Sequence, residues 1–209
     1  MSLTPEDAAR LQACLQGDGV AVIPTDTVYG LACNPESVAA IRRVYELKGR
    51  PPAKPAAIMF FSLAPALGIL GELGPRTRGA LRALLPGPVT LLLPNPKQRF
   101  PLACNPSSSA SALLGLRVPA LDDGPLAALA TVEAPAAQSS ANLSGGADAR
   151  RLTDVPVEIR AGADLVLDGG ELPGTASTVI DLADYERSGA WRVVREGPLN
   201  RAAVERLLG

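Results

Sequence analysis

The stretch VAVIPTDTVYG, residues 20–30, decides the kind of fold expected for this chain. Its apolar part, VAVIP (residues 20–24), is typical of a buried strand. The polar turn that follows carries the hydroxyl groups of Thr25, Thr27 and Tyr29. Ligands of open α/β sheets gather at the carboxyl ends of strands, so this turn is a candidate binding site. The alternative is an ordinary strand-to-helix turn whose threonines bond only to neighbouring backbone groups.

Apolar segments of the same kind recur along the chain and alternate with helical patterns. Further strands are predicted at AAIMFF (56–61), VTLLL (89–93), LGLRV (114–118), AAQSS (136–140), DLVLD (164–168), STVIDL (177–182) and WRVVRE (191–196). Helices are predicted from Pro5 to just before Gly17, from 34–36 onward with Val38, Ile41, Val44 and Tyr45 on one face, and over 74–85, 124–130 and 198–208. Buried strands interleaved with helices predict an α/β domain with a mixed sheet. The Pro- and Ser-rich segment 95–111 is expected to be a long surface loop or lid.

Composition narrows the classes of function. The length of 209 residues fits one domain over residues 1–209. The formal net charge of −1 gives no global electrostatic attraction to nucleic acid. Histidine is absent, which excludes Ser-His and Cys-His nucleophile pairs and histidine-ligated zinc.

The cysteines and the apolar runs indicate in which cellular compartment the protein is expected. Cys14, Cys33 and Cys104 are scattered without a Cys-x-x-Cys pair, which indicates reduced cytosolic thiols packed as small hydrophobes. The opening MSLTPEDAARL is polar and typical of a helix cap rather than a signal peptide. No apolar run approaches the ~18 residues that a membrane-spanning helix needs. A cytoplasmic protein without membrane contact is therefore expected.

A cluster of cations, KGRPPAK (residues 48–54), follows the second helical pattern. It holds Lys48, Arg50 and Lys54, and its glycine and prolines end the helix and stiffen the loop. No acidic residue follows until Glu72. Cations on a stiff loop without local partners suit an anionic ligand such as phosphate or carboxylate. A solvated basic turn is the alternative.

Other polar residues stand at or near the predicted strand ends. The loop SSANLSGG (139–146) offers hydroxyls, the Asn142 amide and backbone N–H groups, although no lysine follows its glycines as in a Walker loop. Arg117 and Arg195 stand in otherwise apolar strands, where a charge requires solvent or a partner. Ser177 adds a hydroxyl from a turn rich in glycine and threonine. Ordinary turns and edge-strand arginines are the alternatives.

These motifs together resemble a known family, the YrdC-like proteins or threonylcarbamoyl-AMP synthases. The matching segments are PTDTVYGL, YELKGRPPAKP, LLPGPVTLLL, RVP, SSANLSG, LDGG, GTASTVIDL and VVREG, in the order found in that family. The resemblance implies an α/β fold, a twisted open mixed sheet with flanking helices that encloses a positively charged cavity. Because the chain stops at Gly209, it is similar to the single-domain form of the family.

The resemblance also implies an activity. Members of the family are nucleotidyltransferases that condense L-threonine, bicarbonate and ATP to threonylcarbamoyl-AMP and pyrophosphate. Mg²⁺ is expected to arrive on the ATP phosphates, without a metal site made by the protein. The expected partner is a tRNA-modifying transferase complex that passes the threonylcarbamoyl group to tRNA, and weak contact with tRNA or double-stranded RNA is implied as well.

The nucleotide side of the site is implied by motif position. Lys48 and Arg50 are expected to hold the ATP phosphates and the acyl-phosphate region of the intermediate, and thus to be the catalytic residues. Ser140, Asn142 and Arg195 are expected to contact the nucleotide.

The threonine side follows from the same matching. Thr25 or Thr27, together with Arg117 and Ser177, is expected to hold threonine, and the arginine takes its carboxylate. Lys54 stands where many members have His or Asn near threonine, which leaves its role open.

Two alternative functions are also considered from the sequence. The carbamoyltransferase domain of hydrogenase maturation proteins, which makes a carbamoyl-adenylate, shows a pattern close to KGRPPAKPAAIM (residues 48–59). That enzyme normally carries acylphosphatase and zinc-finger modules, for which this sequence has no counterpart. A double-stranded-RNA-binding module without catalysis is the second alternative, against which the charge of −1 and the scarcity of aromatic residues argue.

Overall fold

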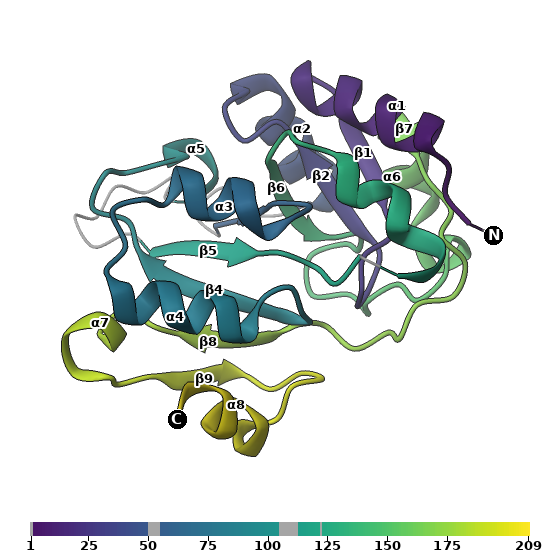
Figure 1. Ribbon diagram of the computed structural model, residues 1–209. Helices are drawn as coiled ribbons and strands as arrows, with labels where there is room; N and C mark the ends of the chain where they lie inside the picture. Colours follow the sequence, from purple (N-terminus) through teal and green to yellow (C-terminus); the bar gives the residue numbers. More distant parts are fainter. Residues whose placement is uncertain (1, 50–54, 105–112, 122) are drawn as a thin grey trace.

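The computed structural model describes residues 2–49, 55–104, 113–121 and 123–209 (Figure 1). In these residues, nine strands form one sheet in the order β7-β1-β2-β6-β3-β5-β4-β8-β9. The strands are β1 (Val20–Ile23), β2 (Gly30–Cys33), β3 (Ala57–Met59), β4 (Val89–Pro94), β5 (Leu113–Arg117), β6 (Ala136–Ser140), β7 (Leu165–Val166), β8 (Thr178–Asp181) and β9 (Arg192–Arg195). Three neighbouring pairs, β1–β7, β3–β5 and β4–β8, run parallel and the others antiparallel. The expected mixed α/β sheet is therefore confirmed.

Helices flank this sheet. They are α1 (Pro5–Gln16), α2 (Val38–Lys48), α3 (Leu63–Ile69), α4 (Pro75–Leu84), α5 (Pro101–Cys104), α6 (Val157–Gly162), α7 (Tyr185–Ser188) and α8 (Arg201–Leu208), with the 3₁₀ turns η1 (Gly124–Thr131) and η2 (Leu152–Asp154). The start of α1 is fixed by a reciprocal cap between Thr4 and Asp7. Helix α2 ends at Gly49, whose φ of 56° lies in the left-handed region that glycine adopts without strain. Lys48 is therefore the last residue of α2, directly before this turn.

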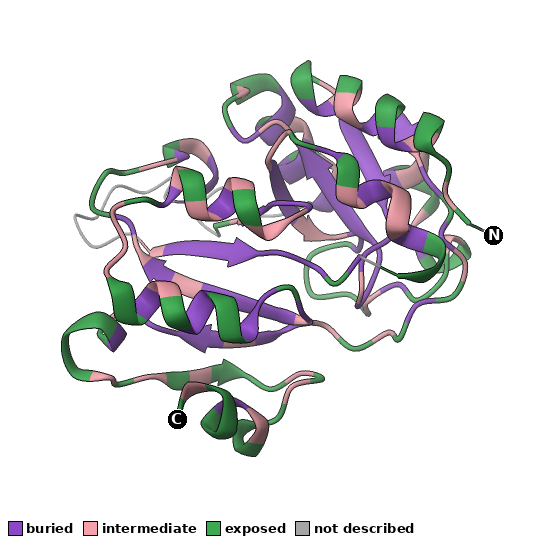
Figure 2. Ribbon diagram, viewed as in Figure 1, coloured by how far each residue is buried: buried purple, intermediate pink, exposed green. Residues whose placement is uncertain are grey.

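The sheet has two differently covered regions. Around β1 and β2 every strand residue is buried, and α1 and α2 pack on these strands (Figures 1 and 2). In β4 and β5, alternate residues such as Leu91 and Leu116 join the core with Leu81 of α4. Because successive side chains in a strand point to opposite faces, the intervening residues of β4 and β5 face the other side. That other side carries the cavity described below.

Most predicted elements are present, with corrections at several places. Strand β2 was not predicted, since GLAC has little β-propensity and its first residue, Gly30, belongs to the predicted turn. Helix α2 begins at Val38, after the cap Ser37, rather than at 34–36. The prediction that Val38 lies on the buried face is wrong: it is exposed, whereas Ile41, Val44 and Tyr45 are buried. The last helix, α8, begins at Arg201 because Asn200 caps it.

The predicted surface loop 95–111 is also corrected where the structure describes it. Asn95 is buried and exchanges two hydrogen bonds with the backbone of Arg99. Phe100 and Ala103 are buried in the core. The segment 95–104 is thus packed structure that includes α5; residues 105–111 lie outside the described residues.

The remaining expectations concern reduced cysteines, membrane contact and cellular location. Cys33 and Cys104 are buried, Cys14 is half-buried, and none of the three forms a disulfide. Burial raises the pKa of Cys33 and of Cys104 to about 12, so both thiols stay protonated. Over the described ranges, each helix is too short or too polar to cross a membrane. A cytoplasmic location stays a prediction.

Candidate active site

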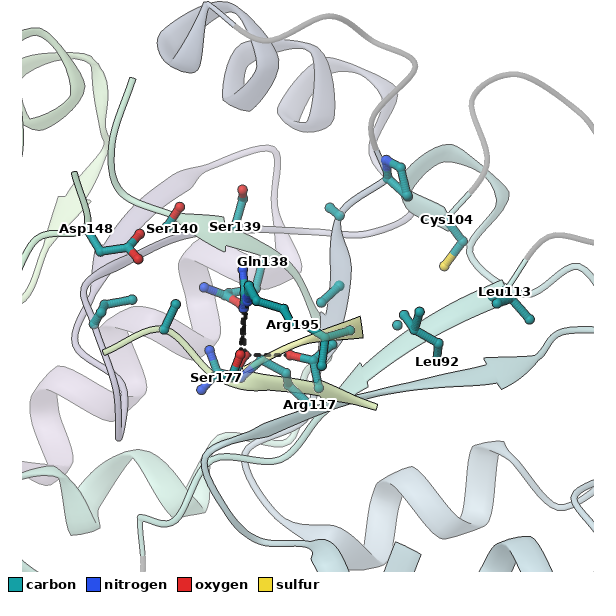
Figure 3. A pocket seen from close by; sticks show the side chains of 18 residues that line it. Leu92, Cys104, Leu113, Arg117, Gln138, Ser139, Ser140, Asp148, Ser177 and Arg195 are labelled. Carbon is teal, nitrogen blue, oxygen red and sulfur yellow. Dashed lines mark hydrogen bonds between the residues drawn. The ribbon is translucent and has the colours of Figure 1, made fainter. Parts of the chain in front are cut away.

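A cavity of about 550 Å³ opens on the face of the sheet away from α4 (Figure 3). Its size falls within the range of about 300–1,000 Å³ that small-molecule sites occupy. Alternate residues of six strands line it: Gln138 and Ser140 of β6, Ala57 of β3, Leu113, Gly115 and Arg117 of β5, Thr90 and Leu92 of β4, Val179 of β8 and Arg195 of β9. The rest of the lining comes from three polar residues, Ser139, Asp148 and Ser177, and from Val28, Pro55, Ala56, Cys104 and Ala176.

Lys48 and the SSAN loop meet at one edge of this cavity. The Lys48 ammonium is 3% exposed and donates to the backbone oxygens of Ser140 and Asn142, the latter at 2.8 Å, and to Asn142 Oδ1 at 2.9 Å. Ser140 Oγ donates to the same Asn142 oxygen at 2.7 Å. The structure thus brings Lys48, Ser140 and Asn142 together, as the sequence predicts. What the three bind stays a prediction.

Arg117 lines the cavity from the end of β5. It is 3% exposed, and its Nη2 donates to Asp26 Oδ1 at 2.6 Å and to Thr27 Oγ1 at 3.1 Å. Asp26 also accepts from the backbone N–H of Ala120. The arginine therefore joins the turn after β1 to the end of β5, and Thr27 enters the site as its neighbour. Asp26 was not among the predicted site residues, although its position between two predicted threonines was a signal.

Burial dominates the electrostatics of this ion pair. It raises the pKa of the Asp26 carboxyl, and the attraction of Arg117 only partly offsets that effect. Burial likewise lowers the pKa of the Arg117 guanidinium, with the nearby charge of Arg195 acting in the same direction. Within the described residues, Arg117 Nε is the buried side-chain nitrogen that lacks a hydrogen-bond partner. Such a wall favours an added negative charge, because an anion would offset the cost of burying the Arg117 guanidinium and the repulsion between Arg117 and Arg195.

Thr25 has a local role. Its hydroxyl donates to the backbone oxygen of Val28 at 2.8 Å and lies 3.0 Å from the Thr27 hydroxyl. Its oxygen also accepts from the backbone N–H groups of Thr27 and Val28. These contacts shape the turn that holds Thr27 against Arg117. Of the two predicted threonines, Thr27 is the one whose hydroxyl accepts a hydrogen bond from Arg117.

Ser177 and Arg195 make a second polar corner (Figure 3). The Arg195 guanidinium donates to the Ser177 backbone oxygen at 2.8 and 3.1 Å and to its hydroxyl at 3.2 Å. The Ser177 hydroxyl also lies 2.8 Å from that of Thr90. Arg117, Ser177 and Arg195 therefore line one cavity, as predicted, and Thr90 is a further polar lining residue that sequence reasoning missed.

Two more lining residues were missed, and one candidate contact was misjudged. Gln138 and Asp148 line the cavity, but one stands in a predicted apolar strand and the other in an unremarkable loop. The hydroxyl of Tyr29, a candidate ligand contact in the sequence, instead donates to Asp168 and Gly170 at 3.0 and 2.8 Å. Arg150 pairs with Glu171 at 2.7 Å on the surface and does not line the cavity.

The described structure does not test two predicted site residues or the predicted positive charge of the cavity. Arg50 and Lys54 lie outside the described residues, so their expected contacts remain predictions. The charged residues that line the cavity within the described chain are Arg117, Arg195 and Asp148, and a positive cavity stays a prediction as well. Over the same residues, no group of three or more His, Cys, Asp or Glu side chains is arranged to hold a metal ion.

Comparison with known proteins places this geometry in context. Residues 13–197 match the family model Sua5_yciO_yrdC, described as "Telomere recombination". The chain is 35% identical over 191 residues to threonylcarbamoyl-AMP synthase of Homo sapiens, covering 88% of this chain and 64% of that protein. It is 33% identical to a protein of the same name from Thiobacillus denitrificans, covering 83% of this chain and 89% of that one.

A solved structure extends the comparison. Sua5 of Pyrococcus abyssi, complexed with L-threonine, has a TM-score of 0.83 at 27% identity, and the match covers 100% of this chain and 59% of that one. The chain thus spans 64% of the human protein's length and 59% of the archaeal chain.

Proposed function

The chain belongs to the Sua5/YciO/YrdC family, and from that premise we propose that it is a threonylcarbamoyl-AMP synthase. As such it is a nucleotidyltransferase whose substrates are L-threonine, bicarbonate and ATP. The relatives named above carry this name, and the archaeal structure holds L-threonine. The proposal extends those names to this chain.

One observation carries the proposal: polar residues from distant parts of the chain surround a single cavity. Lys48 bonds to Ser140 and Asn142 at one edge. Arg117, Ser177 and Arg195 line the same cavity, and Arg195 bonds to Ser177. A nucleotide at the Lys48 edge and an amino acid at Arg117 would lie side by side, with the reacting groups between them.

The reaction needs positioning and charge stabilisation more than a protein nucleophile. The threonine amine attacks the bicarbonate carbon, a C–N bond forms, and water leaves to give the carbamate. A carbamate oxygen then attacks the α-phosphorus of ATP, the bond to the β-phosphate oxygen breaks, and pyrophosphate departs. Fixed cations and N–H donors suit the charge that develops on the phosphates. Correct orientation of the reactants alone can contribute about 7–11 kcal/mol.

The proposed roles follow from the contacts. Lys48 fixes the Ser140–Asn142 loop and keeps a positive charge beside the nucleotide. Arg117 binds the carboxylate of threonine, and Asp26 and Thr27 hold its guanidinium in place.

Mg²⁺ is proposed to enter bound to the ATP phosphates. Asp148, which lines the cavity and accepts from the Asn142 amide at 3.4 Å, is the described carboxylate available beside the nucleotide edge. Its oxygens are of the hard type that Mg²⁺ prefers. When bound, the ion would neutralise part of the phosphate charge. Downstream, we propose that a tRNA-modifying transferase complex in the cytoplasm consumes the product.

The test is pyrophosphate release from MgATP in the presence of bicarbonate and each amino acid separately. We expect release that requires both L-threonine and bicarbonate. Release from carbamoyl phosphate and ATP without threonine would indicate the carbamoyl-adenylate reaction instead. No release under either condition, together with RNA binding that weakens steeply with salt, would overturn the proposal in favour of an RNA-binding module.

A further inference from the structure

Gln138 has no part in the roles proposed so far, yet it occupies a central place in the cavity. It lies in β6 and lines the cavity, and the residue is only 5% exposed (Figure 3). Its neighbours across the sheet are Ala32 of β2 and Ala57 of β3. A long polar side chain at a buried position between two alanines calls for a partner.

Within the described parts of the chain, the Gln138 side-chain amide makes no hydrogen bond. The Gln138 amide is also open to the cavity. Among the described residues, Arg117 Nε is the side-chain atom that is both fully enclosed and without a hydrogen-bond partner, so the unbonded Gln138 amide is not fully enclosed. A glutamine amide carries two N–H donors and an acceptor oxygen. These groups therefore face the space that a ligand would fill.

The amide lies beside the start of β2, the strand that follows the Thr27 turn. A Cβ atom placed on Gly30 would come within 2.5 Å of Gln138 Nε2, so the amide rests directly over this glycine. Gly30 follows the turn that contains Thr27, the partner of Arg117. On the other side of Gln138, Ala57 and Gly115 add only small residues to the cavity lining.

We propose that Gln138 is a specificity-determining residue that contacts the side-chain hydroxyl of the bound amino acid. The inference rests on the proposed function, since it assumes that threonine occupies this side of the cavity. Arg117 can donate hydrogen bonds but cannot accept them. A hydroxyl both donates and accepts, and the Gln138 amide can satisfy it in both directions. Thr90 and Ser177 already bond to each other.

The experiment compares L-threonine with L-2-aminobutyrate, which has the same carbon skeleton without the hydroxyl. In Gln138→Met the length of the side chain is kept and the amide is removed. We expect the KM for threonine to rise about tenfold with kcat unchanged, the effect of losing one neutral hydrogen bond made equally in the ground and transition states. The KM for 2-aminobutyrate stays the same, so the preference for threonine falls by the same factor.

Stability gives a second readout with a matched control. Because the Gln138 amide bonds to no described protein group, the Tm of ligand-free Gln138→Met is expected to equal or exceed that of the wild type. Gln12 serves as the control, since its side-chain oxygen accepts from the backbone N–H groups of Glu133 and Ala134. Gln12→Met should lower Tm and leave both KM values unchanged.

Calorimetric titration with each amino acid separates this inference from the proposed function. If the wild type binds threonine more tightly than 2-aminobutyrate but releases no pyrophosphate, the synthase activity fails and Gln138 can still be judged from binding. If Gln138→Met keeps the wild-type preference, in turnover or in binding, the assignment of Gln138 is wrong. Absence of any threonine binding to the wild type would overturn both.

Discussion

The two regions of the sheet use similar-looking apolar strands for different purposes. In β1 and β2 every residue is buried, and these strands serve the core. In β4 and β5 one set of alternate residues enters the core, while the other set, which includes Leu92 and Arg117, lines the cavity. An apolar run therefore does not by itself say whether both faces of a strand are covered. A single polar residue at a period-two position marks the face that is left for a ligand.

The largest expected effect comes from breaking the buried ion pair of the cavity wall. Arg117→Met leaves the Asp26 carboxylate buried without its partner, which should lower the free energy of unfolding by about 3–5 kcal/mol. Pyrophosphate release should fall at least about 100-fold, because a preorganised donor is lost. Urea unfolding and the release assay measure the two effects.

A double variant separates them. Adding Asp26→Asn to Arg117→Met removes the uncompensated charge and keeps an oxygen for the Ala120 N–H. Most of the stability should return, whereas activity should not. Recovery of both would show that Arg117 acts only as a structural partner of Asp26.

A pair of leucines tests the comparison of the two regions directly. Leu31 of β2 is fully buried, and Leu31→Ala should cost about 2–5 kcal/mol of unfolding free energy through the cavity it leaves. Activity per folded molecule should be retained. Leu92→Ala, at a half-buried position on the cavity floor, should cost less stability and raise the KM for a substrate. Equal behaviour of the two variants would remove the distinction between the regions.

A smaller effect is expected from the hydroxyl pair at the polar corner. Thr90→Val removes the bond between Thr90 and Ser177 and should cost about 1 kcal/mol. The contacts of Arg195 with the Ser177 backbone oxygen are kept, so kcat should change little. Thermal unfolding and steady-state kinetics check this, and a collapse of kcat would instead give Thr90 a direct part in the reaction.

The smallest effect lies far from the cavity, on the surface beside β1. Arg43 and the Val20 N–H both bond to Asp164 and lower the pKa of its carboxyl below the ordinary value of 3.8. Because the folded-state pKa is the lower one, the stabilisation is complete above about pH 5 and is lost as pH falls through that pKa. Since the pair is partly exposed, Asp164→Asn should cost only about 0.2–1 kcal/mol at pH 7. Urea unfolding should show this difference shrink progressively as pH falls below 3.8; a difference that does not change with pH would assign it to something other than charge.

The sequence predicted the fold where apolar runs and helix caps agree. Strands β1, β4, β5 and β6 and helix α1 follow from local patterns. Strand β2 was missed because its identity depends on pairing with β1 and β6 and not on its own residues.

The site was predicted only in part, and the limit is physical. Lys48, Ser140 and Asn142 were found because they belong to recognisable motifs, and the structure joins them by hydrogen bonds. Asp26 and Gln138 were missed. Whether these two residues line or support the cavity depends on which strands are neighbours and which face of the sheet is left uncovered. The local sequence around them determines neither.

The most direct test of the central claim is a crystal structure with L-threonine and a non-hydrolysable ATP analogue bound together. We expect both ligands in the one cavity, with the threonine carboxylate on Arg117 and the phosphates beside the Ser140–Asn142 loop that Lys48 holds. Ligands bound outside this cavity, or phosphates seated on Arg117 with the amino acid at the loop, would contradict it.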